Sequence, residues 1–152
     1  MTIRCEIVSQ ERTVFEGDVD IVVVPGVDGE MGILPNHSPL LSTIRLGVIK
    51  VRQAGEEQIF TVTGGLLEVQ PTIVTILADA AENVDEINMA RAEEARERAR
   101  QRLAEGPPPG TEAYLAAEAA LRRSTLRLDA ARRLGGRRRD VASRAAGEGN
   151  SG

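Results

Sequence analysis

The sequence predicts an α+β protein, in which an N-terminal all-β sandwich is followed by a C-terminal antiparallel two-helix hairpin. Residues 1–83 contain short runs in which apolar and polar residues alternate, the pattern of half-buried strands. Residues 84–136 change to a helical period, with apolar positions three or four residues apart. Residues 137–152 are polar and small, and we expect a disordered tail there. These changes predict two domains with a boundary near Asn83.

The first domain is predicted from short β-branched runs separated by turn residues. Many short strands with frequent turns are typical of a sandwich or barrel. Gly64-Gly65 lies between two runs and predicts a bulge or tight bend. Residues 29–41, GEMGILPNHSPLL, are rich in turn residues yet apolar, and we expect a loop there. The runs are TIRCEIV, RTVFEG, DVDIVVV, GVIKVRQ, EQIFTVT, GLLEV and TIVTILA.

Two helices are predicted from their caps and breakers. Asp85 is placed to cap the first helix, and the prolines of residues 106–110, GPPPG, end it. Thr111 is placed to cap the second helix, and Gly135-Gly136 end it. Glutamates three or four residues before arginines, such as Glu93 before Arg96, predict ion pairs along the first helix.

The seam between the two helices is predicted to be rich in alanine. Small side chains bury little area, and at about 25 cal/mol per Å² such a seam gives only marginal stability. We therefore expect the hairpin to need a partner surface and to be movable. The predicted seam residues are Ala92, Ala95, Ala99 and Leu103 on the first helix, and Tyr114, Ala117, Leu121, Ser124, Leu128 and Ala131 on the second.

Charge is divided unevenly between the two domains. Residues 1–84 hold 5 basic and 12 acidic side chains, a net charge of −7, and residues 85–152 hold 14 and 11, a net charge of +3. The arginines of the second half form either a solvated helix face or a strip that binds an acidic protein surface, a phosphate group or nucleic acid. Nucleic acid is the least favoured of these, because the whole chain is acidic and carries no groove-reading motif.

Common catalytic motifs are absent from the sequence. It has no phosphate-binding GxxxxGK[ST], no HExxH and no CxxC, and its single histidine and single cysteine leave a His/Cys metal site without ligands. Cys5 alternates with Ile3 and Ile7, which predicts a buried hydrophobic role. A lone cysteine cannot form an internal disulfide, so we expect a protein of a reducing compartment. The chain has no run of about 18 apolar residues and no secretory h-region, so we expect neither a membrane span nor a secretory signal.

An ordered set of short signatures resembles one family. Val24-Pro25-Gly26 and residues 29–41, followed by Leu46-Gly47-Val48-Ile49 and then residues 62–69, VTGGLLEV, are similar to the epsilon subunit of F-type ATP synthases. The resemblance covers residues 3–134 in order and includes both predicted domains. No single signature is long, and the specificity comes from their order.

The resemblance implies a non-catalytic part of the central rotor stalk, peripheral on the cytoplasmic face of the bacterial plasma membrane. Epsilon subunits grip the gamma subunit and rest on the c-ring, and Glu30 and His37 would lie on the loop that contacts them. The apolar residues of 29–41 would divide between the core and a docking surface. The helical hairpin can extend toward the alpha and beta subunits of the catalytic head and inhibit ATP hydrolysis. The resemblance implies no required cofactor.

The resemblance leaves open whether ATP binds this chain as a regulatory ligand. Some bacterial members bind it through an Ile/Leu-Asp-x-x-Arg-Ala motif, and residues 87–92 here read INMARA, with Asn88 in place of the aspartate. An amide offers a donor where a carboxylate only accepts. A solvated helical face is the alternative. Asn88 departs from the family's nucleotide site, whereas the residues that match it are Glu82, Arg91, Arg98, Arg123 and Arg127.

Two other classes stay open from the residues alone. A free-standing regulatory sandwich that binds an acidic partner would not need the ordered signatures. An enzyme would need a catalytic constellation, and His37 beside two prolines is better explained as a contact residue. A stable complex with a gamma subunit would separate the three classes.

Overall fold

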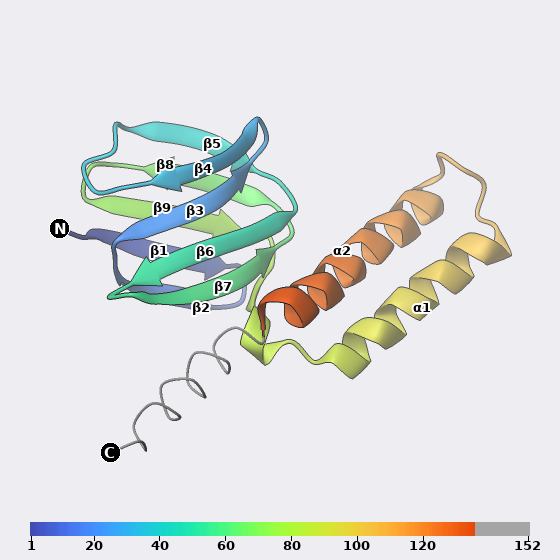
Figure 1. Cartoon of the computed structure of the whole chain (residues 1–152). Coiled ribbons are helices and arrows are strands. Elements are labelled where there is room, and N and C mark those ends of the chain that lie inside the picture. The colour runs from blue at the N-terminus through green and yellow to red at the C-terminus, as the bar shows by residue number, and fades with distance from the viewer. Residues whose placement is uncertain (136–152) are drawn as a thin grey trace, which may run out of the picture. The chain divides into compact units, whose positions relative to one another are not determined.

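A computed structural model describes residues 1–135 of the chain (Figure 1). These residues form two compact units, the first from Met1 to Glu86 and the second beginning at Ile87. The first unit is built of strands and the second of two helices, as the change of sequence period predicts. The predicted tail, residues 137–152, lies outside the described residues.

The first unit is a ten-stranded sheet that folds over itself into a sandwich. Neighbouring strands follow the order β10-β7-β6-β3-β5-β8-β9-β1-β2, and β4 pairs with β3. Among the described strands, β1 and β9 run parallel and every other pair is antiparallel. The strands are β1 (Ile3–Ser9), β2 (Thr13–Val19), β3 (Ile21–Gly26), β4 (Gly29–Ile33), β5 (Leu40–Ile44), β6 (Gly47–Gln53), β7 (Glu56–Val62), β8 (Gly65–Val69), β9 (Ile73–Ala78) and β10 (Ala81–Asn83).

The core lies between the two layers of the sandwich and is aliphatic. Alternate residues of each strand point inward, as in Ile3, Cys5 and Ile7 of β1, which are all buried. Burial, followed by the charge of Glu6, raises the pKa of the Cys5 thiol to about 12. Cys5 is therefore a small apolar core residue, as its alternation predicts.

The apolar, turn-rich segment 29–41 is more regular than the sequence predicts. Instead of one loop it contains all of β4, a connection over residues 34–39, and the start of β5. β4 forms because it pairs antiparallel with β3, a long-range contact that the local abundance of Gly and Pro does not reveal. Its apolar residues divide between buried and exposed positions, since Ile33 is buried and Leu34 and Leu41 are exposed. That the exposed ones form a docking surface stays a prediction.

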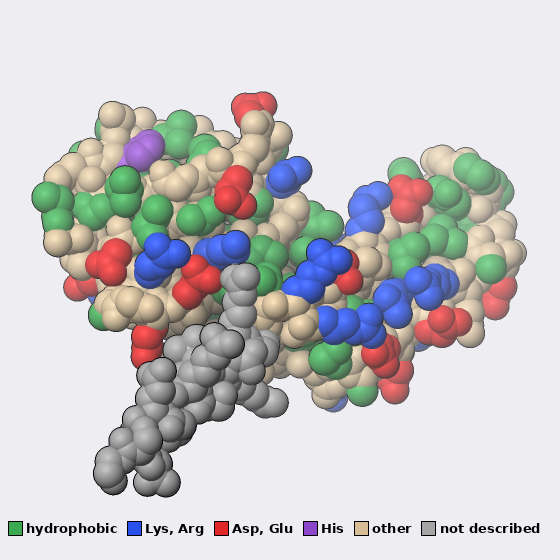
Figure 2. Space-filling model, viewed as in Figure 1, with side chains coloured by type: hydrophobic (Ala, Val, Ile, Leu, Met, Phe, Trp, Pro, Cys, Tyr) green, Lys and Arg blue, Asp and Glu red, His purple; other side chains and the backbone are tan. Residues whose placement is uncertain are grey.

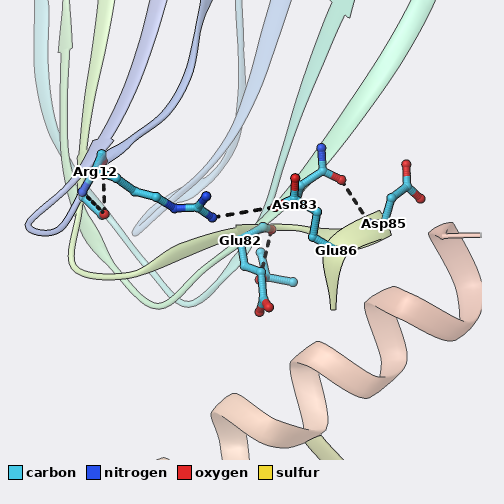
Figure 3. A network of polar contacts seen from close by, with 7 residues as sticks. Arg12, Glu82, Asn83, Asp85 and Glu86 are labelled. Carbon is cyan, nitrogen blue, oxygen red and sulfur yellow. Dashed lines mark hydrogen bonds and ion pairs between the residues drawn. The ribbon is translucent and has the colours of Figure 1, made fainter. Parts of the chain in front are cut away.

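The segment that leaves the sandwich is held on it up to Glu86 (Figure 3). β10 pairs with β7, and a short 3-10 helix, η1 (Val84–Glu86), follows. Val84 is buried, and the side chain of Asn83 accepts a hydrogen bond from the backbone N–H of Asp85 at 2.9 Å. The carboxylate of Glu86 lies 3.7 Å from the guanidinium of Arg12. The first unit thus ends with a fixed segment.

The second unit consists of α1 (Met89–Glu105) and α2 (Glu112–Leu134). Asn88 caps α1, because its Oδ1 accepts from the backbone N–H of Arg91 at 3.1 Å. The prediction that Asp85 caps this helix is wrong, since Asp85 belongs to η1 on the sandwich. Thr111 caps α2 as predicted, with its hydroxyl accepting from the N–H of Tyr114.

The two helices pack along the predicted small-residue seam. Ala92 and Ala99 of α1 are buried, as are Ala117, Ser124 and Leu128 of α2. Small residues here let two helix backbones approach closely, and the Ser124 hydroxyl is satisfied within its own helix by the carbonyls of residues 120 and 121. Neither described helix is long and apolar enough to span a bilayer.

Glu93 pairs across the hairpin rather than along its own helix. Its carboxylate accepts from the guanidinium of Arg132 on α2 at 3.0 Å. The predicted pairing of Glu93 with Arg96 is therefore replaced by an exposed contact between α1 and α2.

Candidate functional site

The two residues predicted to contact the rotor lie on different kinds of structure. Glu30 is exposed, but on strand β4 opposite Pro25 of β3, so the prediction that it lies on a loop is wrong. His37 is half-buried in the connection 34–39. Its backbone N–H donates to the Leu34 carbonyl at 3.2 Å, and its Nδ1 lies 2.7 Å from the carbonyl of Ser38. His37 is therefore held against its own loop.

The connection 34–39 is also tied to the far end of the β8–β9 hairpin. The backbone N–H of Asn36 donates to the carbonyl of Pro71 at 3.0 Å, and Asn36 adopts a φ of 63°, a conformation that asparagine tolerates better than most residues. The fixed φ of Pro35 and Pro39 restricts the loop, as do the backbone hydrogen bonds that Asn36 and His37 donate. It presents Leu34, 57% exposed, at the end of the sandwich.

An apolar surface crosses the outer face of the sandwich on strands β5, β8 and β9. Leu66 and Leu77 are directly opposed on β8 and β9, and Leu41 lies two residues from Thr43, the β5 partner of Leu66. Leu41, Leu66 and Leu77 are 66%, 38% and 49% exposed. We call these three residues the leucine stripe. Single exposed leucines are ordinary, but three on neighbouring strands, with exposed Thr43 and Glu68 between Leu41 and Leu66, form a candidate interaction surface.

A shallow groove adjoins the leucine stripe where β5 and β8 pair near the connection 34–39. Its lining is more apolar than polar and includes Leu41 of the stripe. The groove places the stripe and the loop of His37 on one continuous part of the sandwich. Its lining residues are Pro39, Leu40, Leu41, Glu68, Val69 and Gln70.

Four predicted nucleotide-site arginines share one face of the hairpin. Arg98 follows Glu93 by five residues on α1, and Arg127 precedes Arg132 by five residues on α2. Because the helices are antiparallel, both steps lead toward the turn that joins them. At ~100° per residue, both side chains are turned about 140° from that pair, onto the opposite flank of the seam and at the same level. Arg91 precedes Arg98 by two turns and Arg123 precedes Arg127 by one, so they lie on the same face.

A fifth arginine on that face escaped the sequence prediction. Arg102 lies one turn beyond Arg98, at the level of Arg123, and the i,i+4 spacing would have revealed it. We call Arg91, Arg98, Arg102, Arg123 and Arg127 the arginine face. Four of them are exposed and Arg127 is half-buried. Among the described residues, no ion pair involves the four exposed arginines of this face. Figure 2 shows basic side chains gathered along the hairpin.

The remaining two predicted site residues are placed differently. Asn88 lies at the start of α1, and its side-chain oxygen is engaged in capping. Glu82 is half-buried in β10 of the first unit, where its carbonyl accepts from the Thr61 hydroxyl at 3.4 Å. Neither unit by itself therefore contains all six residues. No cluster of possible metal ligands occurs among the residues that the structure describes.

Comparison with protein families covers both units. Residues 2–84 match the family described as ATP synthase, Delta/Epsilon chain, beta-sandwich domain. Residues 85–132 match that of the long alpha-helix domain of the same chain. The chain belongs to the ATP synthase delta/epsilon family. This confirms the resemblance carried by the signatures of residues 24–69, and the sandwich and hairpin are the two domains of that family.

Similar proteins identify the epsilon type within this family. An ATP synthase epsilon chain of Dehalococcoides mccartyi is 47% identical over 131 residues, which cover 85% of this chain and 91% of that one. An ATP synthase epsilon chain of Herpetosiphon aurantiacus is 45% identical over 132 residues, covering 87% and 96%. The chain is therefore an F-type epsilon subunit of ATP synthase.

Solved structures share its fold. A chain in the cryo-EM structure of the Euglena gracilis mitochondrial ATP synthase, OSCP/F1/c-ring, has a TM-score of 0.71 at 23% identity and covers 86% of this epsilon chain and 81% of its own length. A chain in the cryo-EM structure of the Tetrahymena thermophila mitochondrial ATP synthase central stalk/c-ring has a TM-score of 0.54 at 14% identity. It covers 86% of this chain and 97% of its own length. At these identities the likeness concerns the fold.

Proposed function

We propose that this epsilon subunit is a non-catalytic component of the central rotor stalk that couples a proton-carrying c-ring to the catalytic head. The leucine stripe is the observation that carries the proposal. It gathers three exposed leucines on neighbouring strands, whereas the other large hydrophobic residues exposed on the sandwich, Met1, Val27 and Leu34, lie outside those strands. Membership of the ATP synthase family supports an occupant from the same complex. The protein is then peripheral, on the cytoplasmic face of the bacterial plasma membrane.

The sandwich offers two surfaces to the stalk. The leucine stripe docks the gamma subunit, because covering exposed leucines is favourable by the hydrophobic effect. The end that carries Glu30, Leu34 and His37 rests on the c-ring. Its hydrogen-bonded, proline-containing connection suits a contact that transmits torque, since a loop with few free dihedrals yields little under load.

Two measurements test this assignment. The purified chain should co-elute with the gamma subunit of the same organism in size-exclusion chromatography. A Glu30→Ala/His37→Ala variant should keep its melting temperature within about 2–4 °C, because both side chains make few contacts, yet weaken proton pumping driven by ATP hydrolysis in reconstituted synthase. A chain that never binds gamma, or a double variant that pumps normally, contradicts the proposal.

The hairpin is the regulatory part of the proposal. In one state it lies with the sandwich, and in another it extends toward the alpha and beta subunits and inhibits ATP hydrolysis. The four exposed arginines of this face, Arg91, Arg98, Arg102 and Arg123, form no ion pair among the described residues and repel one another unless an anion is present. Guanidinium groups bind phosphate oxygens in bidentate fashion. ATP bound at the arginine face therefore favours the folded state, by as much as its affinity differs between the two states.

Asn88 sets the expected strength of ATP binding. Losing one charged hydrogen bond typically costs about 1.5–3 kcal/mol, or roughly one to two decades of affinity, so we expect a dissociation constant in the high micromolar to millimolar range. An Asn88→Asp variant should bind ATP more tightly. It should also fold normally, because aspartate caps helices as well as asparagine does.

Calorimetry on the full chain tests the nucleotide site. Arg98→Gln should lose ATP binding, whereas the matched control Arg122→Gln should keep it. Arg122 lies on the same helix as Arg123 but is paired with Glu118 at 3.0 Å, away from the arginine face. Absence of heat from both the natural chain and the Asn88→Asp variant at several millimolar ATP would exclude the nucleotide role and leave the arginines as a protein-binding face.

A further inference from the structure

The outer face that carries the leucine stripe also carries carboxylates. Strands β5, β8, β9, β1 and β2 are consecutive neighbours in the sheet, so their outward residues form rows across it. One row contains Leu66, Leu77 and the half-buried Val8. The next row lies two residues along each strand, about 6–7 Å away. It runs through Leu41, Glu68, Thr75, Glu6 and Glu16. We call Glu6, Glu16 and Glu68 the acidic row.

Glu68 lies inside the leucine stripe rather than beside it. It is the β8 partner of Leu41, and it is two residues from Leu66 on the same strand and the same face. A partner that covers the stripe therefore also covers Glu68. Gln70 donates to the Glu68 carboxylate at 3.0 Å, and among the described residues Glu68 forms no ion pair. A neutral amide does not compensate a carboxylate that loses its water, so the covering surface must supply a cation.

The other two members of the acidic row face each other. Glu6 and Glu16 are directly opposed on β1 and β2, and like charges at opposed positions destabilise an antiparallel pair. Arg4 pairs with Glu16 and, at 3.8 Å, with Asp18. The side chain of Glu6 has no ion pair or hydrogen bond within the part of the chain that the structure describes. The five strands carry four carboxylates and one guanidinium, a net charge of −3.

The shallow groove beside Glu68 fits the stem of a long basic side chain. Leu40, Leu41 and Val69 line it together with the Glu68 carboxylate. Lysine and arginine lay their methylene stems along apolar surface and keep the charged group at a polar position. A basic side chain in the groove would thus cover Leu41 and place its charge at Glu68. An aliphatic side chain there would bury Glu68 unpaired, and a carboxylate would be repelled.

We propose that the gamma surface that covers the leucine stripe presents basic side chains to the acidic row, one of them in the groove against Glu68. The inference rests on the proposed docking of gamma and names the chemistry of that contact. The leucines contribute affinity through the hydrophobic effect, and the acidic row contributes orientation and selectivity. A partner with only apolar residues, or with carboxylates at these positions, is rejected because it would bury unpaired or repelling charges.

Isothermal titration of the gamma subunit with variants of the full chain tests this inference. Glu6→Gln/Glu68→Gln removes the two carboxylates that form no ion pair, and it should bind gamma about 5- to 50-fold more weakly at low salt. It should be at least as stable to urea as the natural chain, because it removes the repulsion between Glu6 and Glu16. The matched control is Asp28→Asn/Asp85→Asn, two exposed carboxylates outside these strands, with an affinity within about threefold of the natural chain.

Salt dependence and two further variants separate charge from shape. Between about 0.05 and 0.5 M NaCl the natural chain should lose about tenfold in affinity for gamma, and the glutamine variant no more than about twofold. Glu6→Asp/Glu68→Asp keeps both charges and should bind within about threefold of the natural chain. Glu6→Lys/Glu68→Lys should show no detectable binding, because like charges would then meet at the contact.

The outcomes distinguish this inference from the proposed function. A folded glutamine variant that binds gamma as tightly as the control overturns the inference, and so does an equal salt dependence of the natural chain and the glutamine variant. An aspartate variant as weak as the glutamine variant also overturns it, since side-chain shape would then decide affinity. In each of these cases gamma still binds the natural chain, and the proposed function stands. A natural chain that binds no gamma at any salt concentration contradicts both.

Discussion

Replacing the leucine stripe with threonine should abolish tight binding of the gamma subunit while leaving the sandwich folded. The variant Leu41→Thr/Leu66→Thr/Leu77→Thr places β-branched residues on strands β5, β8 and β9, which strands favour. Because the three leucines are partly exposed, each change should cost no more than about 1 kcal/mol of the free energy of unfolding.

The expected loss of affinity follows from the exposed fractions. Those of Leu41, Leu66 and Leu77 together equal about one and a half fully exposed leucine side chains. Covering a leucine contributes about 1.5–3 kcal/mol, so complete covering of the stripe contributes about 2–5 kcal/mol. The variant should therefore bind gamma about 30- to 3,000-fold more weakly.

Isothermal titration of the gamma subunit with each epsilon variant measures this loss. The matched control is Val27→Thr/Leu34→Thr, which removes two side chains that are 54% and 57% exposed but lie outside the stripe. Its affinity for gamma should stay within about threefold of the natural chain. Circular dichroism melting should show that both variants are folded at the assay temperature.

A stripe variant that is folded and binds gamma as tightly as the control would exclude this role of the leucines. That outcome would mean that another surface holds gamma and that the leucines stay in water in the complex. Equal weakening by stripe and control variants would also contradict it, because the effect would then reflect general loss of apolar surface.

Three further predictions concern the fold itself. A chain ending at Glu86 should be about 1.5–3 kcal/mol more stable to urea than one ending at Asn83, because only the longer chain buries Val84. Gly65→Ala should destabilise by about 3 kcal/mol or more, since its Cβ would lie 2.2 Å from the Leu77 carbonyl, whereas Gly55→Ala meets no atom and should cost only about 1–2 kcal/mol by the same denaturation. Native Cys5 should resist iodoacetamide at pH 8. Because folding raises the pKa of its thiol from 9.0 to about 12, thiol ionisation favours the unfolded chain between these pH values, and a Cys5→Ala variant should lose less stability there. Rapid labelling of the folded chain would contradict its burial.

Local patterns determined the parts of the fold that depend on one element at a time. The alternation of Ile3, Cys5 and Ile7 predicts a strand and its buried face, because side chains of a strand point alternately to opposite sides. Thr111 after the prolines predicts the start of α2, because capping involves only neighbouring residues. The ordered signatures of residues 24–69 also indicated the family that the comparisons confirm. The contact and nucleotide roles stay predictions.

Tertiary structure decided which of several locally equivalent residues is used. Asp85 and Asn88 are both good caps, and Asn88 caps α1 because burial of Val84 holds Asp85 on the sandwich. Residues 29–33 form a strand because β3 supplies a partner. The sequence by itself does not show that Arg98 and Arg127 lie at the same height along the hairpin, since only the packing of the helices sets their register. In each case the deciding contact joins residues far apart in sequence, and a local pattern carries no information about such contacts.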